Sequence, residues 1–434
     1  MTKTQNTKSV QVAIIGAGAS GLMTAIAIAR AIEDAGQDPK LTTIILLDGS
    51  HKIGIKILVA GGGRCNVTHH AVDEHQYATT KPAIVRTAFK RFSANDAIRF
   101  FKKIGVDLKQ EPTGKMFPIT DDAHTVLHAL LDEADRLGIS IVNPWRVDRI
   151  EHSEVGYAIY SKKDHQPIFA SRVVLAVGGK ALPKSGSDGH GYEIAKSLGH
   201  TITKDIFPAL VPLIAADNSR WITKLSGIAC PATLSVVTST EKRIKSFTND
   251  TLITHFGLSG PAPMDISRYL SAAKLTDRKS HLEINWLPDQ SFEQADEHLT
   301  DLGKSQIRTH LRTLIPERLA MALCEQAGID PAIPGHALSR DARRTLAHLL
   351  TATKVYIQAD RGFTHAEVTA GGIPLDEINR KDFQSRQSKG LYLVGEILDV
   401  DGRIGGFNFQ WAWSTGYIAG NAIARSILDD NPSG

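Results

Sequence analysis

Short apolar runs and helical repeats alternate at both ends of the chain. Residues 11–15 (Gln-Val-Ala-Ile-Ile) and 41–47 are rich in branched apolar side chains, a pattern typical of strands buried on both faces of a parallel sheet. Between them, apolar residues recur at helical spacing from 22 to 32. Residues 172–177 and 391–394 repeat the strand pattern. We therefore predict an α/β fold whose sheet draws strands from both chain ends.

The middle of the chain has a different pattern. Strand-like runs bounded by turn residues occur at 209–214, 232–237, 281–286 and 355–357. Between residues 291 and 353, leucines recur at helical spacing among charged residues. This order indicates a β-rich domain interrupted by a helical one, both inserted before the chain returns to the first sheet near residues 383–393.

A glycine-rich turn directly follows the first strand and reads Gly16-Ala17-Gly18-Ala19-Ser20-Gly21. Gly16 permits a tight turn, Gly18 leaves room for a pyrophosphate, and Gly21 lets the next helix pack close to the sheet. The N–H groups and dipole of that helix favour phosphate binding. Asp48, after the second strand, would accept hydrogen bonds from a ribose hydroxyl. The turn therefore predicts a dinucleotide site, which serves FAD and NAD equally.

Composition and charge narrow the class of protein further. The chain has 434 residues, a net charge of +4 and no long block of like charges, so we expect no nucleic-acid partner. Three cysteines lie far apart without a CxxC pair, at Cys65, Cys230 and Cys324, so no metal site is predicted. Without a signal-peptide pattern or a membrane-length apolar stretch, we expect a cytoplasmic protein that does not bind membranes.

Residues 54–68 hold several glycines and two cations, Lys56 and Arg64. Because interior glycines disfavour a helix, we expect a loop whose backbone approaches a ligand. The two cations would neutralise a pyrophosphate or a substrate carboxylate. Cys65 is interpreted chiefly as a small buried side chain, with a thiol beside the cofactor as the alternative.

Several segments together resemble the BaiN-type flavoproteins, the family that includes the aminoacetone-oxidase-like enzymes. They are Gly54–Thr68, Lys115–Pro118, Leu175–Gly179, Thr254–Pro261, Val368–Gly372, Gly390–Gly402 and Gly405–Ala412. The resemblance extends from about Val12 to Gly420 and implies FAD bound in an extended form. Activities in that family include flavin-dependent oxidation of small amines and NAD(P)H-linked reduction of carbon–carbon double bonds.

Pattern and resemblance together predict a Rossmann-like FAD-binding domain assembled from residues 1–206 and 355–434. The inserted barrel-like, β-rich domain is expected at 207–290, returning around 351–375, with a small helical domain at 291–350. One glycine motif means one dinucleotide domain. NAD(P)H would therefore act as a transient electron donor without a Rossmann domain of its own.

The expected cofactor site lies at the strand ends and helix starts of this domain. A helix beginning near Phe407 would direct its N–H groups at the N1–O2 edge of a flavin, and Glu396 would contact the ribityl chain or ribose. Val147 is expected to contact the adenine. The full set is Gly16, Ala17, Gly18, Ala19, Ser20, Gly21, Asp48, Lys56, Gly62, Gly63, Arg64, Asn66, Val147, Gly178, Gly179, Gly395, Glu396, Gly405, Gly406, Phe407 and Asn408.

The leading hypothesis is a flavin-dependent oxidoreductase that exchanges a hydride between flavin N5 and a small-molecule substrate. His255 is a candidate acid–base group because histidine titrates near neutral pH, and Cys65 and Arg64 are weaker catalytic candidates. Two alternatives stay open, an FAD-dependent RNA-modifying enzyme and a flavin redox sensor without turnover. The sequence leaves the substrate and the oligomeric state open.

Overall fold

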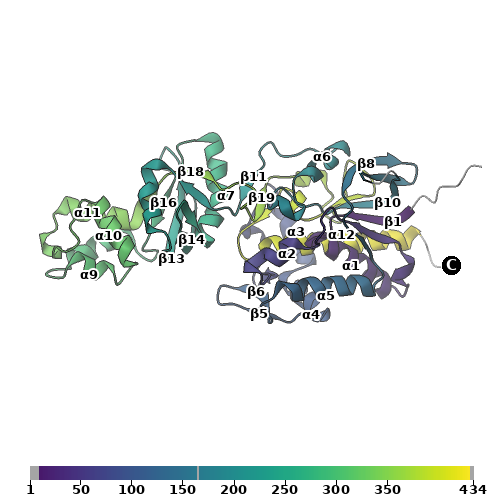
Figure 1. Cartoon of the computed structure of the whole chain (residues 1–434), viewed down its shortest axis with the longest axis horizontal. Helices are drawn as coiled ribbons and strands as arrows, with labels where there is room; N and C mark the ends of the chain where they lie inside the picture. Colours follow the sequence, from purple (N-terminus) through teal and green to yellow (C-terminus); the bar gives the residue numbers. More distant parts are fainter. Residues whose placement is uncertain (1–8, 164–165, 431–434) are drawn as a thin grey trace, which may run out of the picture. The chain divides into compact units, whose positions relative to one another are not determined.

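The computed structural model describes residues 9–163 and 166–430, which form two compact units. The larger unit contains Met1–Phe207 and Val368–Gly434, and the smaller contains Pro208–Glu367. Figure 1 shows the purple N-terminal and yellow C-terminal elements together in the larger unit. Residues 355–367, which the sequence analysis placed in the FAD domain as well as in the returning β-rich domain, lie in the smaller unit.

The larger unit is built on a seven-stranded sheet in the order β7-β2-β1-β10-β9-β8, with β20 also paired to β10. Strand β10 meets antiparallel β9 along its first half and parallel β20 along its second half, so the sheet forks there. Strands β7, β2, β1, β10 and β20 are parallel. The strands are β1 (Ser9–Ile15), β2 (Ile44–Leu47), β7 (Ser140–Val142), β8 (Val147–Ser153), β9 (Gly156–Ser161), β10 (Ile168–Leu175) and β20 (Leu391–Leu393).

Two helices from opposite chain ends pack together in this unit, α1 (Ala19–Asp34) and α12 (Phe407–Asp430). A Cβ added at Gly416 would lie 2.7 Å from the Ser20 carbonyl oxygen, and one added at Gly420 would lie 2.6 Å from that of Thr24. Small residues therefore set the separation of the two helices. Further elements are α2 (Ile55–Val59), β3 (Thr68–His69), β4 (Tyr77–Ala78), α3 (Pro82–Arg91), α4 (Ala94–Lys103), β5 (Leu108–Gln110), β6 (Lys115–Pro118), α5 (Ala123–Arg136), α6 (His190–Ser197), β19 (Val368–Ala370) and β21 (Asp401–Gly402).

The smaller unit contains a seven-stranded antiparallel sheet in the order β17-β16-β13-β14-β15-β12-β18. Its two outer strands, β17 and β18, are separated by the single residue Tyr356, so one bent segment closes the sheet into a barrel-like form. The strands are β12 (Leu213–Ala215), β13 (Ala229–Val237), β14 (Arg243–Ile253), β15 (Gly257–Ser259), β16 (His281–Asn285), β17 (Thr353–Val355) and β18 (Ile357–Asp360).

Helix α7 (Pro261–Thr276), which the sequence analysis did not predict, packs on β13 and β14. The expected single strand over 209–214 is instead β11 (Phe207–Ala209) followed by β12, because Leu210 between them has a φ of +49°. The helical insert contains α8 (Phe292–Thr300), α9 (Ile307–Leu311), α10 (Glu317–Gln326) and α11 (Arg340–Ala352). Among the described residues, no helix is long and apolar enough to cross a membrane.

Replacing Gly416 by valine should destabilise the larger unit by about 2 kcal/mol or more, because the new side chain meets the α1 backbone. The matched control is Ala422→Val on the same helix at a half-buried position, with an expected loss below about 1 kcal/mol from helix propensity. Chemical denaturation of both variants measures the difference. Equal stability of the two variants would contradict the packing described here.

Candidate cofactor site

In the turn after β1, the fold requires glycine at two positions, Gly16 and Gly21, but not at Gly18. Gly16 has a φ of +103°, and a Cβ there would overlap the Ala176 carbonyl. A Cβ at Gly21 would overlap the Gly16 carbonyl. Gly18, by contrast, has an ordinary φ of −84°, and a Cβ there meets no described atom within 4 Å. The space beside Gly18 is where a bound pyrophosphate would approach the backbone.

The N-terminus of α1 lies at this turn. Its N-cap residue, Gly18, has no side chain, and among the described residues no acidic group lies in the first helical turn. The first turn of the helix therefore supplies no acidic side chain of its own to its N–H groups and positive dipole end. This is the electrostatic environment that a dinucleotide pyrophosphate requires.

Asp48 braces the same turn. Its Oδ2 accepts a hydrogen bond from the Ala17 N–H at 2.8 Å, and its Oδ1 accepts one from the Ser50 N–H at 2.7 Å. The carboxylate thus fixes two backbone segments at the carboxyl end of the sheet. Its expected contact with a ribose remains a prediction that this geometry permits, because a carboxylate can accept several hydrogen bonds.

The expectation that residues 54–68 form only a loop is wrong for Ile55–Val59, which form helix α2. The glycines lie on either side of this short helix, so its interior carries no helix-breaking residue. Gly61, Gly62 and Gly63 follow with positive φ, and these are the residues that make the turn.

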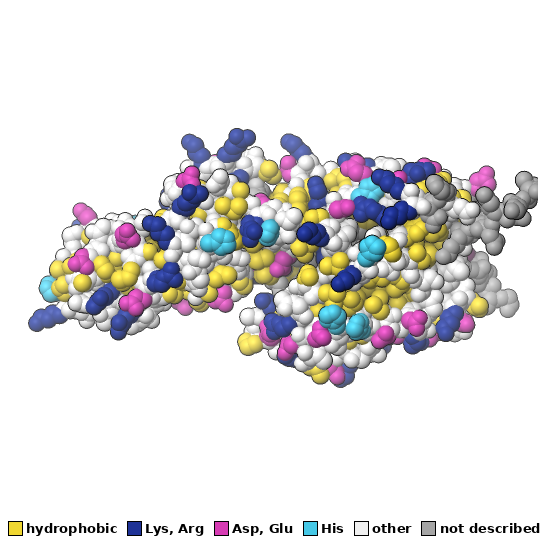
Figure 2. All heavy atoms as spheres, in the orientation of Figure 1, with side chains coloured by type: hydrophobic (Ala, Val, Ile, Leu, Met, Phe, Trp, Pro, Cys, Tyr) yellow, Lys and Arg dark blue, Asp and Glu magenta, His cyan; other side chains and the backbone are white. Residues whose placement is uncertain are grey.

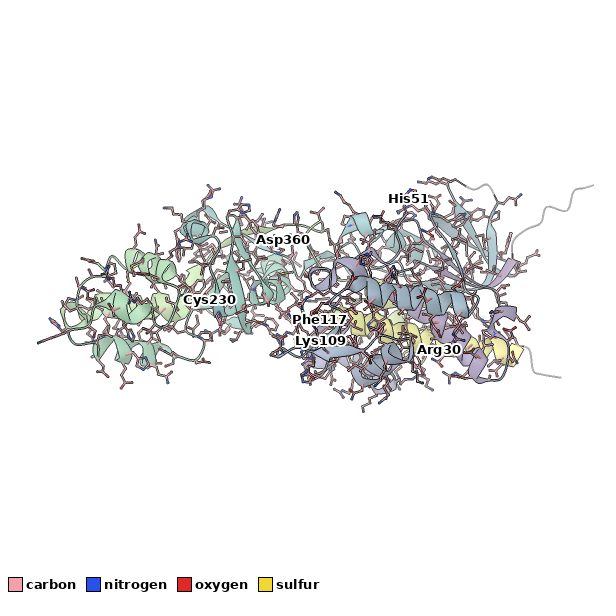
Figure 3. The ribbon with its side chains drawn as sticks, turned by 60° about the horizontal axis from the view of Figure 1, so that its bottom comes forward. Arg30, His51, Lys109, Phe117, Cys230 and Asp360 are labelled. Atoms are coloured by element: carbon pink, nitrogen blue, oxygen red, sulfur yellow. The ribbon has the colours of Figure 1, made fainter. Side chains whose placement is uncertain are left out.

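Arg64 and Cys65, the residues after these glycines, are both engaged within the protein. Arg64 Nη1 lies 2.6 Å from Glu111 Oε1, and its guanidinium lies 4.1 Å from the ring centroid of Phe117, a residue of β6 that Figure 3 labels. Cys65 is fully buried, and burial raises the pKa of its thiol to about 12. At neutral pH Cys65 is therefore a protonated, packed thiol, and Arg64 is held by protein groups.

An ion pair links the second glycine-rich segment to the C-terminal part of the sheet. Lys56 Nζ lies 2.6 Å from Glu396 Oε2 and 3.2 Å from Ser187 Oγ. The other oxygen of Glu396 accepts a hydrogen bond from the Thr369 N–H at 3.0 Å. Both charged side chains are partly exposed, so the pair can also contact a ligand.

The two glycines after β10 leave room for this cluster. A Cβ at Gly178 would lie 2.7 Å from Ser187 Oγ, and one at Gly179 would lie 2.8 Å from Glu396 Oε1. Ser187 and Thr369 were not among the predicted site residues. Thr369 could have been predicted as a site residue, because it lies within the family-like segment Val368–Gly372. For Ser187 the only indication in the sequence was the presence of neighbouring glycines.

Three buried side-chain atoms of this unit have no hydrogen-bond partner among the described residues: Ser153 Oγ at the end of β8, and two nearer the glycine-rich segments, Asn66 Oδ1 and the Tyr192 hydroxyl. Burial raises the pKa of Tyr192, and the charges of Glu396 and Asp399 raise it further, so this hydroxyl stays protonated at neutral pH. An unpaired buried polar group is costly. Asn66 Oδ1 and the Tyr192 hydroxyl therefore fit a site that a polar ligand completes.

The start of α12 is shaped by Gly405 and Gly406, whose φ values are +126° and +91°. A Cβ at Gly406 would lie 2.6 Å from the Thr68 backbone, so glycine is required there. The Asn408 side chain bonds both backbone groups of Gly402, at 2.8 and 3.0 Å. The Asn408 amide therefore holds this loop, a role that the sequence analysis did not predict, and Phe407 stacks on His69 with 4.9 Å between the ring centroids.

Val147 and His255 lie in different units. Val147 is buried at the start of β8, two residues after Trp145, whose N–H donates to the Asp48 carbonyl at 2.6 Å. His255 lies in the smaller unit, exposed in the turn between β14 and β15, where its ring contacts that of Phe256. The adenine contact of Val147 stays a prediction, and among the described residues no partner would make His255 an acid or a base.

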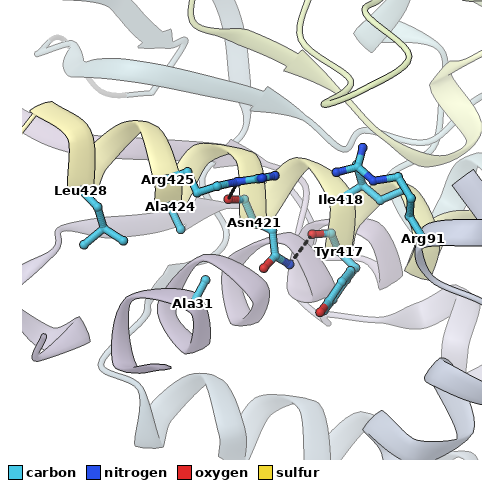
Figure 4. Close-up of a pocket in the computed structure, with 8 residues that line it drawn as sticks. All are labelled: Ala31, Arg91, Tyr417, Ile418, Asn421, Ala424, Arg425 and Leu428. Carbon is cyan, nitrogen blue, oxygen red and sulfur yellow. Dashed lines mark hydrogen bonds between the residues drawn. The ribbon is translucent and has the colours of Figure 1, made fainter. Parts of the chain in front are cut away.

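A hollow of about 300 Å³ lies toward the C-terminal ends of α1 and α12 (Figure 4). Its wall is formed by residues of α1, α3 and α12, including Ala31, Arg91, Tyr417 and Asn421. The Asn421 side chain donates to the Tyr417 carbonyl at 2.8 Å within the helix. This hollow is separate from the glycine turn, which lies at the opposite end of α1.

These features define a Rossmann-type dinucleotide-binding protein, with one glycine turn, one helix N-terminus and a charged pair at the carboxyl ends of parallel strands. The family model described as "HI0933-like protein Rossmann domain" matches residues 10–422. The chain belongs to this family, and the resemblance to the BaiN-type flavoproteins is confirmed.

Relatives and solved structures agree with this assignment. The 3-dehydro-bile acid Δ(4,6)-reductase of Clostridium scindens is 34% identical over 96% of this chain and 99% of its own. The ribosomal RNA dihydrouridine synthases of Haemophilus influenzae and Escherichia coli are 31% and 30% identical, over 95% and 96% of this chain and 98% and 97% of their own.

Two solved structures share the fold at low sequence identity. An Escherichia coli quinol fumarate reductase matches with a TM-score of 0.51 and 16% identity, covering 99% of this chain and 72% of its own. The 3-ketosteroid Δ1-dehydrogenase of Sterolibacterium denitrificans matches with a TM-score of 0.50 and 12% identity, covering 97% and 100%. The protein is an FAD-dependent oxidoreductase.

Gly18→Val should destabilise the apoprotein by less than about 1 kcal/mol, since the backbone angle is ordinary and the space is open, and only the poorer N-cap residue costs stability. The same variant should lose at least about tenfold in FAD affinity, because the valine occupies the pyrophosphate position. Thermal unfolding without FAD and FAD titration by flavin fluorescence measure the two effects. Gly21→Ala is the contrasting variant and should unfold at lower temperature, because its methyl group overlaps the Gly16 carbonyl.

Asn66→Leu also tests FAD binding separately from folding, by removing a buried polar atom that has no partner among the described residues. Leucine has a similar shape and removes the unpaired Oδ1, so the apoprotein should be as stable as before or slightly more stable. FAD affinity should fall if the cofactor supplies the missing hydrogen bond. Isothermal titration with FAD and unfolding of the apoprotein test this, and unchanged FAD affinity would remove Asn66 from the site.

Proposed function

We propose that this FAD-dependent oxidoreductase reduces a carbon–carbon double bond conjugated to a carbonyl group. The observation that carries the proposal is a reaction shared by relatives whose substrates differ. A Δ(4,6)-reductase of a 3-dehydro-bile acid acts beside a ketone, and a dihydrouridine synthase forms its product by saturating the uracil double bond beside a carbonyl. Both relatives align with nearly the whole of this chain.

The bound flavin would supply the hydride in this reaction. The residues of the chain would position the cofactor and provide the charged groups around it. The α1 N-terminus and Gly18 would hold the pyrophosphate, while Lys56 and Glu396 would face the sugar-alcohol part of the cofactor. The Tyr192 hydroxyl holds its proton at neutral pH because burial raises its pKa, which makes it a hydrogen-bond donor toward FAD or substrate.

We further propose that the substrate is a small conjugated ketone and that NADH or NADPH is the electron donor. The reductase relative supports a small substrate. On the face of the molecule drawn in Figure 2, basic and acidic side chains are interspersed, and the net charge is only +4, which favours a small molecule over a polyanion.

A uridine in ribosomal RNA is the second candidate substrate. Its support is the pair of dihydrouridine synthases, whose identities of 31% and 30% are close to the 34% of the reductase. The reaction at the double bond would be the same, and only the recognition of the substrate would differ. Binding to RNA would then depend steeply on salt concentration.

Anaerobic stopped-flow experiments test the reaction. We expect NADH or NADPH to bleach the flavin, and a steroid-like 3-oxo-Δ4 ketone to restore its colour faster than the same ketone without the double bond. The saturated ketone is the matched control, because it differs only in the bond to be reduced.

Other outcomes of the same experiment identify the rivals. Reoxidation by undermodified ribosomal RNA, with no response to conjugated ketones, would favour the second candidate. If the reduced flavin responds to no ketone and to no RNA, but is rapidly reoxidised when oxygen is then admitted, the protein is an oxidase and the proposal is contradicted. A flavin that neither nicotinamide reduces would contradict the proposed donor and favour a sensor without turnover.

A further inference from the structure

Three potential metal ligands meet on the smaller unit, far along the chain from the glycine turn. One ligand atom each from Glu241, His281 and Glu283 lies within 4.8 Å of the other two. His281 and Glu283 occupy alternate positions of β16, so their side chains are on the same face of the sheet. Glu241 comes from the turn between β13 and β14, where its φ is +60°.

The histidine of this group carries an unsatisfied nitrogen. His281 is only 3% exposed, and its Nε2 has no hydrogen-bond partner among the described residues. The ring of Tyr356 packs beside it, with 5.3 Å between the centroids. A buried polar atom without a partner costs free energy, and an imidazole nitrogen together with two carboxylates is a ligand set suited to a metal ion.

Two cations neutralise the carboxylates in the absence of a metal ion. Lys354 Nζ lies 2.9 Å from Glu241 Oε1, and Arg243 Nη2 lies 3.5 Å from Glu283 Oε2. The Lys354 ammonium group also occupies one oxygen that a metal ion would use, and the two cations therefore compete.

We propose that Glu241, His281 and Glu283 bind one divalent transition-metal ion of the Zn²⁺ class. One imidazole and two carboxylates are a mixed nitrogen–oxygen set that suits Zn²⁺ better than Mg²⁺, which prefers oxygen ligands and retains its water. Three protein ligands leave a position for water. The ion would connect the β13–β14 turn to β16 through a ring nitrogen of His281.

The sequence analysis predicted no metal site because the chain has no CxxC pair, whereas the ligands proposed here include no cysteine. The ligands of this site are separated by about forty residues in sequence, and strand pairing brings them together. Val237 of β13 pairs with both His281 and Arg243, which places the turn that carries Glu241 beside β16. The site uses no residue of the proposed flavin site, and the two can be tested separately.

Titration calorimetry of the untagged, chelator-treated holoprotein with ZnCl₂ tests the proposal. We expect one site that Glu241→Gln and Glu283→Gln each weaken by at least about tenfold, since loss of a direct ligand should cost no less than loss of an outer-shell partner. Glu241 is exposed, so its substitution leaves the fold intact. Lys354→Met should bind Zn²⁺ more tightly than the unchanged protein, because the competing ammonium group is removed.

His348→Ala is the matched control, because His348 is an exposed histidine of the same unit outside the proposed ligand set. It should leave Zn²⁺ affinity unchanged. Circular dichroism confirms that each variant is folded, and flavin absorbance confirms that FAD is retained. The proposal is overturned if the unchanged protein takes up no Zn²⁺, if the two glutamine variants bind as tightly as the unchanged protein, or if His348→Ala abolishes binding.

Discussion

The close packing of α12 on α1 is the constraint on which the cofactor site depends. It brings the C-terminal segment to the glycine turn at the other end of the chain. A Cβ at Gly395 would lie 2.7 Å from Ser20 Oγ, and Trp411 Nε1 donates to the Gly395 carbonyl at 3.1 Å. Because Glu396 follows Gly395 directly, any widening of this contact would also move Glu396 away from Lys56. The ion pair is therefore a consequence of helix packing as much as of charge.

A buried polar network fixes the same C-terminal segment from another side. His200 Nδ1 lies 2.7 Å from Glu377 Oε2, and His200 Nε2 lies 2.8 Å from Ser385 Oγ. The order serine, histidine, acid is that of a hydrolase triad, but Ser385 Oγ also accepts hydrogen bonds from the N–H groups of Gln387 and Ser388. The hydroxyl is committed to holding a turn, and the network is structural. A fully satisfied buried network specifies one arrangement of the segments that it joins.

The sequence predicted the site best at positions where the local backbone allows only one type of residue. Gly16 and Gly21 were predicted from the needs of a tight turn and a close helix, and both needs are visible in the structure. Pairings between distant residues could not be predicted in this way. Lys56 and Glu396 are 340 positions apart, and no local pattern reveals that they meet. Arg64 was expected at the cofactor because of its charge, yet Glu111 and Phe117 hold it, since a loop cation binds whichever anion the fold brings near.

Residues that the fold itself does not require are the best indication of where a ligand binds. Gly16 is accounted for by its backbone angle and its neighbours, so it indicates folding alone. Gly18 has neither reason, and Asn66 Oδ1 is buried without a partner. In the smaller unit, His281 Nε2 is in the same position. A buried polar atom that the chain does not satisfy is costly to maintain, so Asn66 Oδ1 and His281 Nε2, which belong to the two proposed sites, are candidates for contact with a bound group. This reasoning uses no resemblance to other proteins, and it applies equally to the flavin site and to the proposed metal site.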